Sequence, residues 1–275
     1  MLIAAALTSA NAVGAETDKL VELINEYRSS PQRCEGRQSP AVGPLTPQPR
    51  LAHPDIASRL NALPDALKRA GYAAAQAQAI VASGPASARD AMALLGERYC
   101  RALTSPQFAD IGISREGSTW RIVLARPLLS PNLRDWREAG KEVLKLTNTA
   151  RTPTRTCGDR RLAPAPPLRW NEALAAAALA HSRDMATGAY FAHVAKDGNT
   201  VGDRAARQGY KWSRIGENIA TGQGAPEQVV AGWLASPHHC ANVMEPSFTE
   251  MGAAYFVNPN SNTIIYWTQV FGTPR

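Results

Sequence analysis

The side chains best suited to chemistry gather in the second half of this 275-residue chain. Histidine is the common metal ligand and acid–base group near neutral pH, and four of the five histidines lie between residues 181 and 239. The fifth, His53, falls in a proline-rich loop, where we expect it to be solvated. Two imidazoles and one carboxylate would form a partial shell for Zn²⁺ with an open coordination position.

Sequence signatures of familiar catalytic sites are missing. The chain contains no G-x-S-x-G elbow, H-E-x-x-H pair, Walker A loop or complete G-x-G-x-x-G. Gly222-Gln223-Gly224 is a lone G-x-G, which we interpret as a loop. Any chemistry must therefore come from side chains that the fold brings together over long sequence distances.

Two helices with recognisable starts are expected to position these side chains. Asn171 can cap the first helix, and His181 lies on its apolar face, so we interpret His181 as a core histidine. Residues 200–203 resemble a capping box that opens a second helix, which should end near residue 208. These helices would flank the segment that contains His193.

The remaining elements alternate helix and strand. Residues 227–235 are expected to be helical, and Ser236 is expected to cap a short helix that starts with proline. Residues 252–257 and 263–271 have the β-branched and aromatic content of strands. Helices that alternate with a few strands predict a mixed α/β sandwich.

The four cysteines lie in an internal repeat. The segment L-I-N-E-Y-R-S-S-P-Q-R-C before the first cysteine is matched by L-T-N-T-A-R-T-P-T-R-T-C at a spacing of 123 residues, and a later set recurs at a spacing of 140. Each copy then holds one early and one late cysteine, which predicts the disulfides Cys34–Cys100 and Cys157–Cys240. The alternative is four free thiols in a cytosolic protein.

The repeat divides the chain into regions. Residues 1–15 end in small residues, as a signal-peptide remnant would, and are too short to span a membrane. A first copy over 16–128, a linker over 129–137 and a second copy over 138–275 follow. Disulfides and a signal remnant together predict export, to the periplasm or the extracellular space.

The charge does not indicate nucleic-acid binding. The formal net charge is +7 and the pI is about 9.5. The arginines are scattered, and the densest group, over residues 151–161, lies in a loop without interleaved aromatic residues. We therefore expect no nucleic-acid partner.

Five motifs in the second copy occur in a fixed order and carry a family resemblance. Together they resemble the CAP superfamily, also called SCP-like (cysteine-rich secretory proteins, antigen 5 and pathogenesis-related proteins), and its bacterial branch most of all. The resemblance covers residues 142–275. The motifs are H-S-R-D-M-A-T-G-A-Y-F-A-H (181–193), D-G-N-T-V-G-D-R (197–204), G-E-N-I-A-T-G (216–222), G-W-L-A-S-P-H-H-C-A-N-V-M (232–244) and Y-W-T-Q-V-F-G (266–272).

This resemblance implies a three-layer α-β-α sandwich with a central cleft that can hold a divalent metal. Carried over to this sequence, the cleft residues are His193, Glu217 and His239. The family's second cleft glutamate has no counterpart here, because residues 234–236 read Leu-Ala-Ser. Zn²⁺ affinity should therefore be modest. His238 would be a spare ligand or exposed.

Two neighbours of these cleft residues are expected to be structural. We expect Asn218 to form a turn hydrogen bond and Ser236 to act as a helix cap. Both titrating histidines, His193 and His239, are expected to protonate near the ordinary pKa of about 6.5, which would weaken metal binding below about pH 6.

The first copy lacks the cleft residues. Tyr99 falls where His239 stands, and Ala79 falls where Glu217 stands. We infer a degenerate copy with a structural or partner-binding role, the alternative being a different small helical domain.

Three functions remain open at this point. The first is an exported binding module, not a conventional enzyme, whose cleft holds a metal, lipid, peptide or cell-surface component. The second is a metal-assisted hydrolase, a protease or esterase, in which Glu217 would be the general base. The third is a cell-wall spacer.

Overall fold

The computed structural model describes residues 3–53, 56, 58–127, 129, 133, 135–261 and 263–275. Most of the predicted linker over 129–137 lies outside these residues. Its last part is helical, because a helix begins at Trp136 and is capped by Asp135. This helix therefore begins inside the segment predicted as a linker.

The first half combines helices and strands. Its helical elements are α1 (Ile3–Arg28), η1 (Pro49–Ala52), η2 (Leu60–Ala62), α3 (Leu63–Arg69) and α4 (Ala88–Leu103). Its strands are β1 (Gln32–Cys34), β2 (Arg37–Ser39), β3 (Thr46–Pro47), β4 (Ala74–Ser83), β5 (Asp110–Glu116) and β6 (Thr119–Pro127).

The second half has longer helices on its sheet. Its helices are α5 (Trp136–Arg151), α6 (Glu172–Gly188), α7 (Val201–Arg207), α8 (Pro226–Leu234) and α9 (Pro237–Met244). Its strands are β7 (Arg155–Cys157), β8 (Arg160–Leu162), β9 (Arg169–Trp170), β10 (Trp212–Thr221), β11 (Glu250–Val257) and β12 (Ile265–Pro274).

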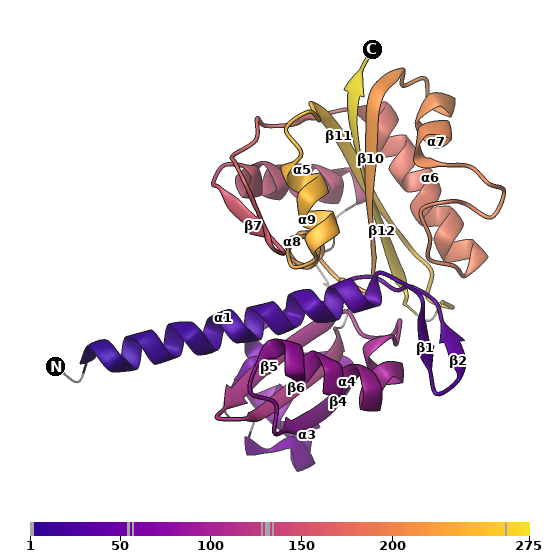
Figure 1. The fold of residues 1–275 in the computed structure, drawn as a ribbon. Helices are drawn as coiled ribbons and strands as arrows, with labels where there is room; N and C mark the ends of the chain where they lie inside the picture. The colour runs from indigo at the N-terminus through magenta and orange to yellow at the C-terminus, as the bar shows by residue number, and fades with distance from the viewer. Residues whose placement is uncertain are drawn as a thin grey trace.

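Each half contains one four-stranded sheet, and the two sheets have matching strand arrangements. The orders are β3-β5-β6-β4 and β9-β11-β12-β10. In each sheet the first pair is parallel and the other neighbours are antiparallel. A two-stranded hairpin, β1-β2 or β7-β8, precedes each sheet. Figure 1 shows the two halves stacked, with α1 running between them.

The sheet of the second half lies between two helical layers. Successive strand residues point to opposite faces. Trp267 and Phe271 therefore join the core formed with α5, α8 and α9, while Val270 joins Leu174 and Ala178 of α6. Helices α6 and α7 lie on one side of the sheet and α5, α8 and α9 on the other (Figure 1). The prediction of a mixed α/β sandwich is confirmed.

The sheet of the first half has one full helical layer and one thin layer. Trp120, Ile122 and Leu124 of β6 pack with α1 and α4. The alternate residues Val123 and Ala125 face η1 and α3 instead. No long helix corresponding to α6 covers that face among the described residues of this half.

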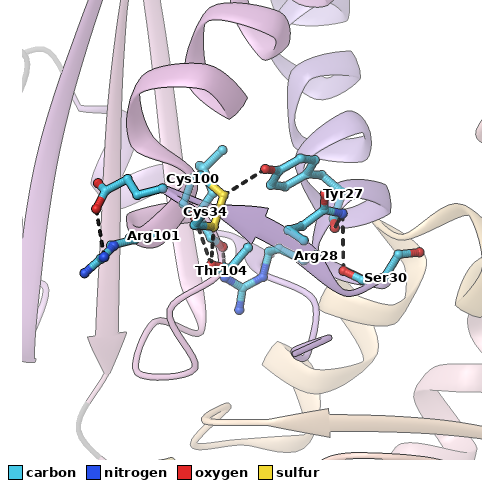
Figure 2. The surroundings of a disulfide bond; sticks show 10 residues. Tyr27, Arg28, Ser30, Cys34, Cys100, Arg101 and Thr104 are labelled. Carbon is cyan, nitrogen blue, oxygen red and sulfur yellow. Dashed lines mark hydrogen bonds and ion pairs between the residues drawn. A yellow bond between two sulfur atoms is a disulfide. The ribbon is translucent and has the colours of Figure 1, made fainter. Parts of the chain in front are cut away.

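Both predicted disulfides are present, with Cα–Cα distances of 5.4 Å for Cys34–Cys100 and 5.5 Å for Cys157–Cys240. Each one ties the end of a hairpin strand to a helix, α4 or α9. Figure 2 shows that Tyr27 points its hydroxyl group at the sulfur of Cys100, 3.0 Å away. The cysteine pairing inferred from the repeat is confirmed.

Buried polar contacts join the two halves. Gln223 is fully buried and donates from Nε2 to the carbonyl oxygen of Pro44 at 2.8 Å. Thr46 donates from its hydroxyl to the carbonyl oxygen of Gln228 at 2.8 Å. Asn25 donates to the carbonyl oxygen of Ala235 at 3.1 Å. The halves are thus held by one buried and two partly buried hydrogen bonds.

A helix that crosses a bilayer needs about 20 consecutive, mostly apolar residues. Within the described part of the chain, no helix has both the length and the apolar character needed to cross a membrane. Helix α1 runs without interruption through Ala15, where the signal remnant is predicted to end.

Candidate functional site

The predicted site residues come from three different elements. His193 lies in the segment between α6 and α7, Glu217 on β10 and His239 on α9. Asn171 caps α6 through its side chain, as predicted. Thr200 and Asp203 form the predicted capping box of α7. The capping box fixes the end of the segment that carries His193, and α6, which ends at Gly188, leads into its beginning.

Glu217 is the centre of the arrangement, and both of its oxygens are bonded. The Nδ1 atom of His193 lies 2.8 Å from Oε1, and Arg204 donates from a terminal nitrogen to Oε2 at 2.7 Å. The carboxylate side chain is only 2 % exposed, whereas His193 is 55 % exposed. An Nδ1–H donated to Glu217 leaves Nε2 of His193 available to solvent.

Arg204 supports the same segment. The guanidinium of Arg204 donates to the backbone carbonyl of His193 at 3.0 Å and to that of Asn199 at 2.9 Å. One buried side chain of α7 therefore holds the carboxylate and the backbone of the histidine segment together. Charge-assisted hydrogen bonds of this kind are stronger than neutral ones.

His181 is a core residue, as expected, but it also borders the site. Its side chain is fully buried, and Nε2 lies 2.9 Å from the carbonyl oxygen of Ala192. The same nitrogen is 3.8 Å from Oε1 of Glu217. Burial lowers the pKa of His181, which keeps the ring neutral.

His239 lies on α9, close enough to His193 for a charge on that ring to lower the pKa of His239. Its Nδ1 atom lies 2.9 Å from the hydroxyl oxygen of Ser236. Burial, with smaller effects of the charges that His193 and His238 would carry, lowers the pKa of His239 to about 3. The expectation that His239 protonates near pH 6.5 is therefore wrong, because charging the ring would require solvating it.

The structure corrects the roles of Ser236 and Asn218. Ser236 precedes α9 but its side chain makes no capping hydrogen bond, and it contacts His239 instead. Asn218 lies within β10 and not in a turn. It donates to the backbone carbonyl of His239 at 3.2 Å and accepts from Asn242 at 3.0 Å. Both residues thus position His239.

The two remaining histidines are exposed. His238, the neighbour of His239, is exposed, and so is His53 in the first half.

The residues present do not form a three-ligand Zn²⁺ site. Both oxygens of Glu217 are taken up by His193 and Arg204. Among the described residues, no group of three or more His, Cys, Asp or Glu side chains is arranged to hold a metal ion. The site offers two imidazoles, those of His193 and His239. In each ring Nδ1 is engaged, and Nε2 makes none of the contacts described above.

Arg204 is the site residue that sequence reasoning missed. It ends one of the quoted motifs but was not assigned a role. The capping box at residues 200–203 places α7, so Arg204 is the next residue along it, and it is only 7 % exposed. A buried arginine needs an acceptor, which could have pointed to Glu217.

Comparison with known proteins identifies part of the chain. The family model of CAP, the cysteine-rich secretory protein family, matches residues 144–271. The uncharacterized protein YkwD of Bacillus subtilis (strain 168) is 35% identical over 131 residues, which are 48% of this chain and 46% of that protein. The uncharacterized membrane protein YlbC of the same organism is 32% identical over 112 residues, 41% of this chain and 30% of that protein. This chain spans less than half the length of each.

Two solved structures resemble the fold more distantly. An extracellular protein containing an SCP domain from Bacillus anthracis has 24% identity and a TM-score of 0.43, with 57% of this chain and 52% of that chain covered. A cysteine-rich secretory protein from Staphylococcus aureus has 16% identity and a TM-score of 0.38, with 56% and 50% covered.

Proposed function

Residues 144–271 form a CAP domain, and we propose that the protein is an exported binding module that holds its ligand at the imidazoles of His193 and His239. Both rings have Nδ1 engaged, by Glu217 and by Ser236 respectively. Both therefore direct Nε2 toward other partners. The ligand is one that coordinates these nitrogens or donates hydrogen bonds to them.

The observation that carries this proposal is the state of the Glu217 carboxylate. A general base needs a free lone pair facing a water molecule or a substrate proton. The oxygens of Glu217 already accept from His193 and Arg204, and the side chain is 2 % exposed. This geometry supports a positioning role for Glu217 and disfavours the metal-assisted hydrolase.

Three classes of ligand suit the two imidazoles of His193 and His239. A divalent metal ion would have only His193 and His239 as protein ligands, so water would complete its shell and the affinity would be modest. A peptide could donate backbone N–H groups to the rings. A lipid headgroup could donate hydroxyl groups. The low pKa of His239 supports all three, because the ring stays neutral in mildly acidic surroundings.

Export is part of the proposal. Two disulfides close long loops in a chain with no free cysteine among the described residues, and such bridges persist in oxidising compartments. In α1, the side chain of Glu16 accepts a hydrogen bond from the backbone N–H of Ala88 at 2.7 Å. N-terminal sequencing of the mature protein should therefore begin near Glu16, and intact Met1 in a reducing cytosol would contradict export.

We infer in addition that the first half, residues 16–128, is a degenerate copy of the same domain that supports the CAP domain. The matching strand orders and the matching disulfides favour this interpretation. Neither Ala79 nor Tyr99, at the positions aligned with Glu217 and His239, offers an imidazole or a carboxylate. This half would then contribute structure or a partner surface and no site chemistry of the same kind.

The binding proposal is tested by titration calorimetry with Zn²⁺ at neutral pH. The wild type should bind weakly, the His193→Ala/His239→Ala variant should not bind, and His238→Ala should behave as wild type, because His238 is exposed beside the site. Equal binding by all three proteins would place the metal elsewhere. Absence of binding by the wild type would leave peptides and lipids as the ligand classes.

The hydrolase alternative is tested in parallel. Wild type and Glu217→Gln are assayed on casein and on ester substrates, with Zn²⁺ present. We expect no turnover by either protein. Turnover by the wild type that is lost in Glu217→Gln would contradict the binding module.

A further inference from the structure

A cavity of about 400 Å³ lies between the two halves, beside the segment that leads to His193. None of its lining residues is His193, Glu217 or His239, so it is separate from the site proposed above. Its volume is within the range of small-molecule pockets. Its lining is shared by both halves: Pro40, Ala41, Val42 and Pro106 from the first, and Ala189, Tyr190, Phe191, Thr221, Ser261, Thr263 and Tyr266 from the second.

The cavity has a buried floor and an exposed rim. Val42, Thr221, Thr263 and Tyr266 are each less than one-tenth exposed, while Pro40, Pro106 and Ala189 are exposed at the mouth. Aromatic rings of Tyr190, Phe191 and Tyr266 contribute to the lining. Such rings favour a planar apolar guest, which can stack on them or meet their edges.

No described lining residue carries a charge. A charged ligand would lose its hydration in such a cavity without gaining an ionic partner. A neutral ligand has no such penalty. The chemistry of the lining therefore selects against carboxylates, phosphates and amines.

One polar atom in the floor has no partner. The hydroxyl of Thr263 is buried and makes no hydrogen bond within the described structure. Buried hydroxyl groups are normally satisfied, and an unsatisfied one needs an explanation. A ligand acceptor, such as a carbonyl oxygen, would provide the missing partner.

The backbone beside Thr263 is held in an unusual conformation. Ile264 has a φ of 63°, which β-branched residues rarely adopt. Its N–H donates to the hydroxyl of Ser261 at 3.1 Å, and its carbonyl accepts from the N–H of Asn258 at 2.7 Å. These bonds fix the segment that presents Thr263 to the cavity. Strained residues of this kind cluster at ligand sites.

From these observations we propose that the inter-half cavity binds a small, neutral aromatic molecule that carries a carbonyl group. The ring lies among Tyr190, Phe191 and Tyr266, and the carbonyl accepts a hydrogen bond from Thr263. Binding requires both halves, because Ala41 and Val42 close one side of the cavity.

The test uses two uncharged probes of similar shape, methyl naphthyl ketone and isopropylnaphthalene, titrated into the full isotope-labelled chain and followed by amide NMR shifts. We expect the shifts to concentrate at residues 40–42, 189–191 and 263–266. Thr263→Val should weaken the ketone about fivefold, the contribution of one neutral hydrogen bond, and change the hydrocarbon less than twofold.

Two filling variants localise the binding. Ala41→Phe should weaken both probes at least tenfold, because the new ring occupies the cavity. Ala75→Phe fills a different apolar pocket, beside α3, and should leave both affinities unchanged. Each variant is checked for an unchanged amide spectrum away from the substitution.

Three results would overturn the proposal. They are no saturable binding of the ketone to the wild type, loss of binding in Ala75→Phe with retention in Ala41→Phe, and an equal effect of Thr263→Val on both probes.

Discussion

Arg28 in the first half and Arg151 in the second occupy equivalent cages of backbone carbonyls. Arg28 donates to the carbonyl oxygens of Gly43, Leu103, Ser105 and Phe108. Arg151 donates to those of Pro166, Val243, Glu245 and Phe248. Each pair of matched acceptors has the spacing of 123 or 140 residues found in the sequence repeat. The two cages are the same structural device.

A second shared contact lies one helical turn earlier. Asn25 exchanges two hydrogen bonds with the backbone of Leu45, at 3.0 and 2.7 Å. Asn148 exchanges the same two with Leu168, at 3.0 and 2.8 Å. The amide and the guanidinium together hold the loop after each hairpin against the first helix of its half.

The halves differ in what covers the opposite face of the sheet. A Cβ atom at Gly112 would lie 2.3 Å from the Cβ of Leu51, next to η1, whereas one at Gly252 would lie 2.0 Å from the backbone nitrogen of Ala175, in α6. The glycine permits close packing in both halves, but only the second half packs a long helix there. Helix α6 leads into the segment that carries His193. The first half has no equivalent of α6 among its described residues, so it has no helix to support such a segment.

The comparison shows that the scaffold and the site are separable. Buried arginine, paired asparagine, disulfide and sheet order are present in both halves. The imidazoles of His193 and His239 and the Glu217–Arg204 pair belong to the second half, where β10, α7, α9 and the segment after α6 carry them. Four experiments test this separation, from the largest expected effect to the smallest.

The disulfides should stabilise the two halves equally. Cys34→Ser/Cys100→Ser and Cys157→Ser/Cys240→Ser each remove a bridge with a sequence separation of 66 or 83 residues. The chain-entropy model gives a loss of about 4 kcal/mol in the free energy of unfolding for each. Urea denaturation measures the loss, and non-reducing peptide mapping verifies the remaining bridge. A loss confined to one variant would show that the halves differ in scaffold.

Replacing the caged arginines should have the next largest effect. Arg28→Met and Arg151→Met each leave several buried carbonyl groups without a donor, which should lower the free energy of unfolding by about 3 kcal/mol. The two losses should agree within about 1 kcal/mol in denaturant titrations, with exposed Arg33→Met as the control. A much smaller loss for Arg28→Met would break the equivalence of the cages.

Asp110 should make the stability of the first half depend on pH. Burial raises the pKa of Asp110 to about 7, despite the hydrogen bond from Tyr72 at 2.8 Å. Its counterpart, Glu250, lies 3.4 Å from Arg169 and 3.0 Å from Asn171. The folded state therefore holds the Asp110 proton more tightly than the unfolded chain does. Stability from this residue is complete below about pH 4 and is lost as pH rises to about 7.

Asp110→Asn should remove that pH dependence. At pH 8 the variant should be more stable than the wild type by on the order of 2 kcal/mol, and at pH 4 the two should be similar. Melting temperatures across this range provide the measurement, with Glu250→Gln as the matched variant. If the stabilities of the wild type and of Asp110→Asn change by the same amount between pH 4 and pH 8, the raised pKa of Asp110 is contradicted.

The smallest difference concerns the surroundings of the disulfides. The hydroxyl of Tyr27 contacts Cys100 in the first half (Figure 2), whereas the position matched to it by the repeat is Ala150. A hydroxyl–sulfur contact at a partly exposed site is weak, so Tyr27→Phe should lower the free energy of unfolding by less than about 1 kcal/mol. Thermal denaturation with Tyr99→Phe as control detects it. A loss above 2 kcal/mol would mean that this disulfide depends on Tyr27.

Much of the scaffold could be predicted from the sequence because its signals are local or repeated. Asn171 and the Thr200–Asp203 box each specify a helix start within four residues. The disulfide pairing followed from a repeat. Helix α5 begins inside the segment predicted as a linker, because Asp135 caps it and this cap was not recognised in the sequence.

The site could be predicted only as a set of residue types. Hydrogen bonds from Arg204 on α7 and from His193 in a loop determine what Glu217 can do. The sequence spacings between Glu217 and these two residues do not show that the side chains meet. Ser236 has the sequence signature of a cap, yet the nearby imidazole competes for its hydroxyl. The pKa of His239 depends on burial, which is set by elements distant in the chain.

The buried contacts between the halves have a mechanical consequence. The loop that follows the site strand β10 is anchored by Gln223 to Pro44, and a Cβ atom at Gly43 would lie 3.0 Å from the backbone nitrogen of Thr221. Separating the halves would break this buried hydrogen bond and the close contact beside it. A load applied to the first half would therefore pass through Pro44 and Gln223 to the loop that follows the strand carrying Glu217.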